Sequence, residues 1–238
     1  ANIRHARQLN AFIRDNGYDA VVCSHLFPME TLTFLRRWER CDVKCYGILS
    51  DYTCIPFLAE TELDGYFLPH TDVRADCVSA GMPAEKLIVS GMPVAAKFTA
   101  PMTKQAAREL LGLPQDKRIY LIMTGGIGCG DAVTLCEAIR RVPDEDALLC
   151  VLPGRNEELR TTLEEKYAGH GVLTVPFTDQ VPAYMHAADV LLSKAGGISS
   201  AEAAVLGVPL VHTMVMPGVA TQHAAFAAVH GLARFPPY

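Results

Sequence analysis

Residues 189–202 read DVLLSKAGGISSAE, an apolar run that leads through two glycines into a polar, helix-like segment. The run at 190–192 has the length and composition of a buried strand. Glycines after a strand let the backbone approach a ligand, and the following helix offers unpaired N–H groups to an anion. We expect Ser199 or Ser200 to cap this helix and Glu202 to lie in its first turn. The stretch predicts a strand–loop–helix unit that can bind an anion.

Short apolar runs alternate with helix-like segments along the whole chain, which is typical of an α/β fold with parallel sheets. The runs are apolar on both faces, as expected where helices cover both sides of a sheet. We expect strands at residues 20–23, 45–49, 65–68, 87–89, 119–123, 147–151, 172–175, 190–192 and 209–211.

Glycine and proline punctuate residues 90–98, and a new strand–loop–helix unit begins soon afterwards. We therefore expect two Rossmann-like domains, 1–98 and 99–238. The first domain opens with a helix-like segment at 3–16 rather than with a strand. We expect this N-terminal domain to be incomplete in the chain.

The composition excludes several classes of protein. The chain has 238 residues and a formal net charge of -5, whereas a nucleic-acid-binding protein needs a basic face. Its eight cysteines contain no C-x-x-C pair, which argues against a zinc site and favours reduced thiols in a cytosolic protein. Residues 203–233 hold no Asp, Glu, Lys or Arg, but glycines and prolines interrupt them, so no membrane span is predicted.

In chain order, the first glycine-rich turn reads MTGGIGCG at residues 123–130 and precedes a helix-like segment at 131–141, and the turn at 196–197 is the second. Taken alone, it is as compatible with an ordinary tight turn as with a phosphate contact. It is not a P-loop, and no acidic residue ends the next strand as in a dinucleotide site. Arg155, which follows that next strand, either reaches a diphosphate or points into solvent.

A third turn reads PGVATQH at residues 217–223 and follows the strand expected at 209–211. Ligands of open α/β sheets bind beyond the carboxyl ends of the strands. Three polar, glycine-rich turns at that edge therefore predict a nucleotide site. Glu202 keeps two interpretations, because its carboxylate could complement the helix dipole or accept two ribose hydroxyls.

The order of these motifs, together with Val175-Pro176-Phe177 and Ala188-Asp189, resembles glycosyltransferase family 28. Within the family the chain is most similar to the diacylglycerol glycosyltransferases, including monogalactosyldiacylglycerol synthase and processive diacylglycerol glucosyltransferase. The lipid II-forming N-acetylglucosaminyltransferase is a wider relative. Gly91-Met92-Pro93-Val94 resembles the interdomain segment of the family, and Leu49-Ser50-Asp51-Tyr52 resembles its Thr-Asp turn.

The resemblance implies a GT-B fold, in which two Rossmann-like domains with parallel sheets face each other. The C-terminal domain would hold a UDP-sugar donor with neither an essential metal nor a cofactor. The first glycine turn would lie near the diphosphate, Phe177 beside the uracil and Glu202 on the ribose. The donor-binding residues expected are Gly125, Gly126, Gly128, Arg155, Phe177, Lys194, Gly196, Gly197, Ser199, Ser200, Glu202, Gly218 and His223.

The chain departs from the family pattern in two places. Lipid-glycosylating relatives carry Gln, Glu and Asn, associated with the sugar hydroxyls, where this chain has Val219, Ala220 and His223. His223 could replace an amide, because a neutral imidazole offers one donor and one acceptor. The amino-terminal glycine-rich loop, whose histidine is often proposed as general base, has no counterpart. Asp51 and His25 are the remaining catalytic candidates, although a turn cap and an ordinary loop histidine are the simpler interpretations.

The sequence thus predicts transfer of a hexose from a UDP-sugar to a diacylglycerol-like lipid by a peripheral protein at the cytosolic membrane face. Two alternatives stay open. One is a nucleotide-sugar-binding subunit that is not catalytic alone, which the altered residues after the third turn favour. The other is an epimerase of the same architecture, which would need further acid and base residues.

Overall fold

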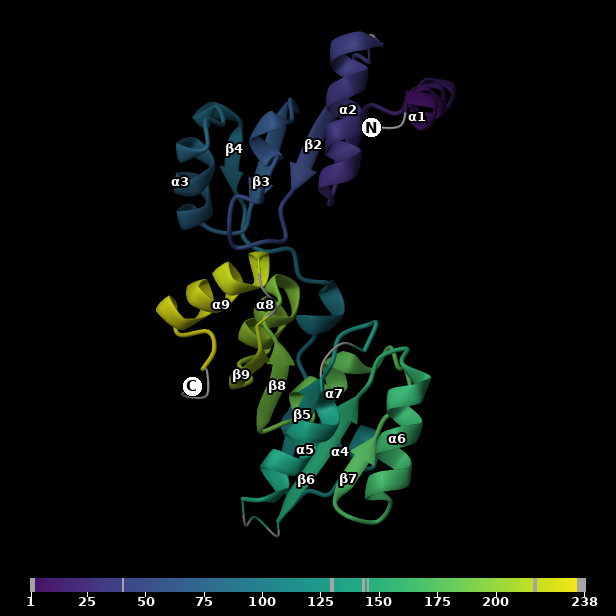
Figure 1. The fold of residues 1–238 in the computed structure, drawn as a ribbon, viewed down its shortest axis with the longest axis vertical. Coiled ribbons are helices and arrows are strands. Elements are labelled where there is room, and N and C mark those ends of the chain that lie inside the picture. The colour runs from purple at the N-terminus through teal and green to yellow at the C-terminus, as the bar shows by residue number, and fades with distance from the viewer. Residues whose placement is uncertain are drawn as a thin grey trace. The chain divides into compact units, whose positions relative to one another are not determined.

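The computed structural model describes residues 3–39, 41–128, 131–142, 144, 146–215 and 218–234. The chain divides into two compact units, Ala1–Pro93 and Val94–Tyr238, which we call unit 1 and unit 2 (Figure 1). The division falls five residues before the expected boundary at 98/99. The physical reason is that Phe98 is buried in the core of unit 2 and Val94 packs against that core.

Unit 1 contains one sheet of four parallel strands in the order β1-β2-β3-β4. Its elements are α1 (Ile3–Asp15), β1 (Ala20–Cys23), α2 (Leu26–Trp38), β2 (Lys44–Ile48), β3 (Gly65–Leu68), α3 (Thr71–Ser79) and β4 (Leu87–Val89), with short 3-10 helices at Leu58–Glu60 and Ala84–Lys86. Each strand is three to five residues long, and apolar residues such as Cys45, Tyr66 and Leu68 are buried in its core.

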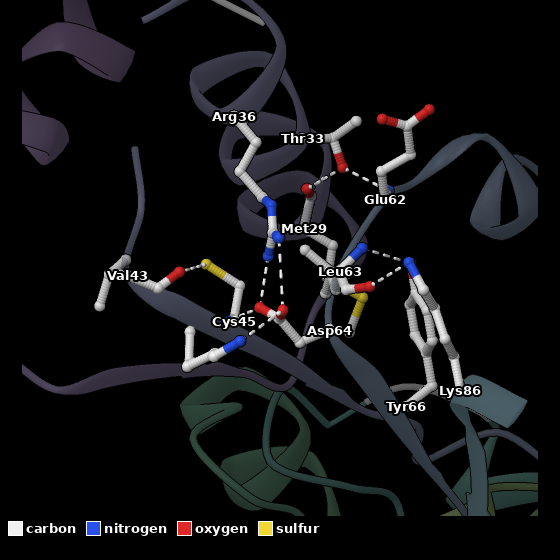
Figure 2. A network of polar contacts seen from close by, with 11 residues as sticks. Met29, Thr33, Arg36, Val43, Cys45, Glu62, Leu63, Asp64, Tyr66 and Lys86 are labelled. Atoms are coloured by element: carbon white, nitrogen blue, oxygen red, sulfur yellow. Dashed lines mark hydrogen bonds and ion pairs between the residues drawn. The ribbon is translucent and has the colours of Figure 1, made fainter. Parts of the chain in front are cut away.

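A polar network ties α2 to the amino ends of β2 and β3 (Figure 2). Asp64, just before β3, forms an ion pair with Arg36 of α2 and accepts a hydrogen bond from the Cys45 backbone N–H at 2.8 Å. The hydrogen bond from Arg36 holds the pKa of the Asp64 carboxyl well below its usual range. Beside it, the Thr33 hydroxyl accepts from Glu62 N at 2.8 Å. These contacts fix the register of α2 on the sheet at the edge opposite to His25 and Asp51.

Unit 2 contains five parallel strands in the order β7-β6-β5-β8-β9. Its elements are a 3-10 helix (Ala96–Phe98), α4 (Lys104–Leu111), β5 (Arg118–Met123), α5 (Ala132–Arg140), β6 (Ala147–Leu152), α6 (Glu157–Tyr167), β7 (Val172–Thr174), α7 (Val181–Ala187), β8 (Val190–Lys194), α8 (Gly197–Leu206), β9 (Leu210–Met214) and α9 (Val219–Val229). The predicted α/β class with two parallel sheets is confirmed.

Helices cover both faces of the central strand of unit 2, which explains why its residues are apolar without alternation. Leu121 packs into a core with residues of α4, α7, α8 and α9. Its neighbour Ile122 packs on the opposite face with residues of α5 and α6. Both side chains are almost fully buried.

Asp189, which belongs to the family-like motif, has a structural role at the amino end of β8. Its carboxylate accepts hydrogen bonds from Ile119 N and from Arg108 of α4, both at 2.8 Å. Lys104 donates a third at 2.7 Å. Asp189 therefore joins α4 to the two central strands, and it lies at the edge away from the glycine turns.

In the described part of the chain, no helix is both long enough and apolar enough to cross a membrane. The uncharged stretch 203–233 forms the end of α8, β9 and α9 instead. The seven cysteines that the structure describes form no disulfide, and Cys129 lies outside the described residues.

Candidate functional site

The strand order of unit 2 reverses between β5 and β8, and a crevice of about 320 Å³ there is lined by residues that include Met123, Thr124 and Lys194. The chain runs outward from β5 through β6 to β7, then returns to place β8 on the other side of β5, where Met123 pairs with Ser193. Such a reversal leaves an opening at the carboxyl ends of the two strands, which is where open α/β sheets bind ligands. The three glycine-rich turns follow β5, β8 and β9 and so share this edge, as the sequence predicted.

The turn after β5 is held against the turn after β6. Arg155 N donates to Gly126 O at 3.1 Å, and Asn156 Nδ2 donates to Gly128 O at 3.2 Å. A Cβ atom on Gly154, whose φ is +67°, would lie 2.3 Å from Gly125 O. Only glycine fits there, because the approach is shorter than any side chain permits and the left-handed backbone disfavours other residues.

Sequence reasoning missed Gly154, although its position after a strand and before a helix could have drawn attention to it. Of the first turn, Cys129 and Gly130 lie outside the described residues.

Lys194 ends β8 and lies over the first glycine turn. A Cβ atom on Gly125 would be 3.2 Å from Lys194 Cε and 3.6 Å from its Nζ. Because β8 and β5 are neighbours in the sheet, this side chain carries a positive charge to the crevice beside the N–H groups of the turn. The arrangement suits an anion.

The start of α8 corrects two expectations. Gly196, not a serine, is the N-cap, with the extended backbone that an N-cap requires, and α8 begins at Gly197. Ser199 and Ser200 lie inside the first turn, and their hydroxyls donate back to Gly196 O at 3.4 and 2.7 Å. Glu202 is therefore the sixth helix residue, in the second turn and not in the first. The serine side chains therefore do not cap α8, because Gly196 already occupies the N-cap position.

Glu202 is half-buried, and burial raises the pKa of its carboxyl, against the opposing charge of Lys97. A helix N-terminus would lower that pKa, and its effect fades beyond the first turn. Among the described residues none donates a hydrogen bond to the Glu202 carboxylate. Glu202 is thus a partly desolvated acceptor in the second turn of the helix that follows β8.

A small pocket of about 110 Å³ lies beside these turns at the carboxyl ends of β5, β6 and β7. Its lining includes Gly125, Gly154 and Phe177, which is 54% exposed. The Arg155 guanidinium lies over the Phe177 ring, 4.3 Å from its centroid. A flat cation stacked on an exposed aromatic ring suits a flat aromatic ligand.

Ser200 and His223 lie in the interior of unit 2, with 2% and 7% of their surfaces exposed. The Ser200 hydroxyl accepts from His212 Nε2 at 3.0 Å while donating to Gly196 O. Burial, with a smaller contribution from His223, lowers the pKa of His212 to about 4. Ser200 and His212 therefore hold the carbonyl of Gly196, at the start of α8, from the interior of unit 2. The sequence analysis did not single out His212, although a histidine inside an otherwise apolar strand could have drawn attention to it.

The third turn is described only in part. Pro217 lies outside the described residues, while Gly218 is the N-cap of α9 with a φ of +105°. Gly218 therefore begins the helix at the same edge as the other turns.

Unit 1 brings its own candidates together at the carboxyl ends of β1 and β2. His25 and Asp51 line a pocket of about 100 Å³ together with Ser24 and Ser50. His25 is the N-cap of α2, and its Nδ1 accepts from Phe27 N at 3.3 Å. His70, which sequence reasoning missed, caps α3 in the same way, with Nδ1 accepting from Asp72 N at 3.2 Å.

Two family models match the chain. The model "Monogalactosyldiacylglycerol (MGDG) synthase" matches residues 2–94, and "Glycosyltransferase family 28 C-terminal domain" matches residues 128–234. Similar curated proteins are processive diacylglycerol beta-glucosyltransferases. That of Bacillus licheniformis is 26% identical over 95% of this chain and 59% of the relative, and that of Bacillus cytotoxicus is 24% identical over 95% and 58%. The chain thus spans under two thirds of their length.

Solved structures share the fold at low identity. MurG of Acinetobacter baumannii superposes with a TM-score of 0.64 at 16% identity, covering 97% of this chain and 63% of that one. The UDP-GlcNAc 2-epimerase of Neisseria meningitidis gives 0.64 at 16% identity, with coverages of 96% and 66%. These likenesses establish a fold of the GT-B type. With one family model on each unit, the chain is similar to glycosyltransferase family 28 along most of its length.

Proposed function

We propose that this protein transfers a hexose from a UDP-sugar to a lipid acceptor of the diacylglycerol type. The observation that carries the proposal is the crevice between β5 and β8, where two glycine turns and the Lys194 ammonium share one edge, and Glu202 lies in the second turn of the helix that starts there. A nucleoside diphosphate offers the matching groups, namely a dianionic bridge, ribose hydroxyls and a flat base. The names of the curated relatives support the acceptor class.

In this proposal each part of the donor has its own partner. The backbone N–H groups of Gly125, Gly126, Gly196 and Gly197 hold the diphosphate, and Lys194 balances its charge. The uracil stacks in the pocket at Phe177, with Arg155 behind the ring. Glu202 accepts the two ribose hydroxyls. Gly128, Ser199, Ser200, Gly218 and His223 complete the predicted donor set, with Ser200 and His223 acting from the interior.

The reaction requires a base for the acceptor hydroxyl and stabilisation of the leaving group. We propose that Asp51 takes the hydroxyl proton as the acceptor oxygen forms its bond to the anomeric carbon of the sugar. The bond from that carbon to the diphosphate breaks, and UDP leaves with the electron pair. The fixed N–H dipoles and Lys194 stabilise its negative charge. We propose that no metal is needed, and that the protein works peripherally on the cytosolic face of a membrane.

Two measurements test the proposal. Calorimetry should show UDP binding of equal affinity with and without a chelator, and binding that vanishes with the chelator would contradict the metal-independent site. Incubation of residues 1–238 with labelled UDP-glucose or UDP-galactose and dispersed diacylglycerol should yield a labelled glycolipid. Binding without transfer would favour a nucleotide-sugar-binding subunit, and an isomerised nucleotide sugar would favour an epimerase.

A further inference from the structure

The hydrogen bond that caps α2 fixes which nitrogen of His25 carries the proton. His25 Nδ1 accepts from Phe27 N at 3.3 Å, and the two rings lie 5.0 Å apart. A neutral imidazole has one nitrogen that accepts and one that donates, whereas an imidazolium has two donors. Because Nδ1 accepts, Nε2 is the ring nitrogen of His25 that is left to donate.

This tautomer conflicts with the role of a general base. A base needs a free lone pair, and the only lone pair on the His25 ring nitrogens is held by the Phe27 N–H. Taking a proton there would break the cap of α2. Asp51 differs, because a carboxylate has several acceptor positions. The two candidates of unit 1 therefore suit opposite tasks, one accepting and one donating.

Both residues line the same small pocket, and the sheet explains why. Cys23 of β1 pairs with Gly47 of β2, so the residues that follow each strand emerge side by side. The pocket also receives Ser24 and Ser50, while Leu26 and Ile55 supply apolar lining. At about 100 Å³ it has room for a small polar head group but not for acyl chains.

We propose that His25 is a positioning residue whose Nε2–H binds an oxygen of the acceptor head group, while Asp51 receives the proton of the neighbouring hydroxyl. The proposal rests on the transferase function above and deepens it. It assigns to this pocket an acceptor that carries a hydroxyl next to a second oxygen, such as a glycerol hydroxyl beside an ester. An acceptor with an isolated hydroxyl would lack the group that His25 recognises.

Two substitutions separate the nitrogens of His25. In His25→Asn the amide oxygen can replace Nδ1 as the cap of α2, but no donor reaches the place of Nε2. In His25→Gln the longer amide can donate from the place of Nε2, but the cap is weakened. We expect His25→Asn to raise the KM for a short-chain diacylglycerol about two- to tenfold, the loss of one neutral hydrogen bond. His25→Gln should keep the KM near wild type and lower the thermal midpoint. Neither should change kcat by more than about twofold, because no proton passes through the ring.

His70 provides the matched control, because it caps α3 by the same contact but does not line the pocket. His70→Asn and His70→Gln should leave the KM for the acceptor unchanged. A loss of about 10²–10⁴-fold in kcat for both His25 variants would identify His25 as the base and overturn the proposal. Equal KM values for the Asn and Gln variants would overturn it too.

A second measurement needs no turnover. Nitrogen chemical shifts of the His25 imidazole in the UDP-loaded chain should show a protonated Nε2 and a bare Nδ1. Adding 1,2-dihexanoylglycerol should move the Nε2 resonance. The deoxy analogue, which lacks the ester oxygen on the carbon next to the free hydroxyl, should not move it. A protonated Nδ1, or an Nε2 insensitive to the probe, would refute this role of His25. Absence of UDP binding or sugar transfer would instead count against the proposed function.

Discussion

The carboxyl edges of the two sheets have the same architecture and opposite chemistry. In unit 2 the turns after β5, β6 and β8 are built around Gly125, Gly154 and Gly196, and they present backbone N–H groups. In unit 1 the turns after β1 and β2 present the side chains of His25 and Asp51. Fixed backbone dipoles suit a permanent anion such as a diphosphate, whereas only side chains can exchange a proton. In the proposed function, the turns of unit 2 therefore bind the donor through the backbone, and those of unit 1 supply the side chains that handle the proton.

Two histidines, His25 and His212, show a similar contrast. In unit 1 His25 is exposed and caps a helix at the ligand edge. In unit 2 His212 is 1% exposed and supports Ser200 behind the second glycine turn. In the proposed function, His25 contacts the acceptor, whereas His212 only supports the backbone turn that binds the donor.

The largest effect should come from giving unit 2 one extra methyl group. Gly154→Ala would force Cβ to within 2.3 Å of Gly125 O, so the two turns must separate. Losing two N–H contacts to a charged phosphate should weaken UDP binding about 100-fold or more. Calorimetry measures this.

The control for that substitution is Gly207→Ala, because Gly207 has the same φ of +67° but no atom within 4 Å of a new Cβ. Both variants should lose about 1–2 kcal/mol of stability from the left-handed backbone. If both retain UDP affinity, the turns do not bind the diphosphate, and the contrast between the units fails.

Glu202 is the carboxylate of unit 2 that we propose as a contact of the ribose. Glu202→Gln should weaken UDP binding by about 1.5–3 kcal/mol, roughly ten- to a hundredfold, because the ribose hydroxyls lose a charged acceptor. The 2′,3′-dideoxy analogue of UDP should bind both proteins equally, which completes a double-mutant cycle. Losses that simply add, without coupling between carboxylate and hydroxyls, would refute the ribose contact.

The same variant should not destabilise the free protein. The pKa of Glu202 is raised in the folded chain, so its contribution to stability is present below the unfolded pKa and is lost as pH rises through the folded pKa. At neutral pH the amide removes a partly desolvated charge. The thermal midpoint of unit 2 should therefore stay constant or rise.

A smaller effect should separate His212, a buried histidine of unit 2, from the helix-capping histidines of unit 1. The folded pKa of His212 is about 4 against an ordinary value of 6.5, so the unfolded chain binds its proton first as pH falls. Stability from this residue is complete above about pH 6.5 and declines toward pH 4, by about 2 kcal/mol between pH 7 and 5.

Amide hydrogen exchange in β8 and β9 at the two pH values would report this loss in unit 2. His212→Gln should flatten the pH dependence there, whereas His70→Gln should leave it unchanged. A wild-type slope that survives in His212→Gln would show that other groups cause it.

The sequence by itself determined the elements and their order. Runs that are apolar on both faces located every strand within a few residues, and the boundaries at Ala20–Cys23 and Leu87–Val89 match the expected ranges. Glycines after strands indicated which turns share one edge of the sheet, because that signal is local and depends only on which backbone conformations a residue allows. The predicted site roles of the individual residues remain proposals.

Only the tertiary structure decided the features that depend on approach between distant segments. Gly154 must be glycine because Gly125 O, far along the chain, lies where its side chain would be. Because α8 starts at Gly197, Glu202 lies in the second turn and not in the first, and burial raises the pKa of its carboxyl. The tautomer of His25 follows from the Phe27 N–H, whose direction exists only once α2 has formed. Pattern specifies elements because periodicity is encoded along the chain, whereas clash, burial and hydrogen-bond direction arise only when the elements pack.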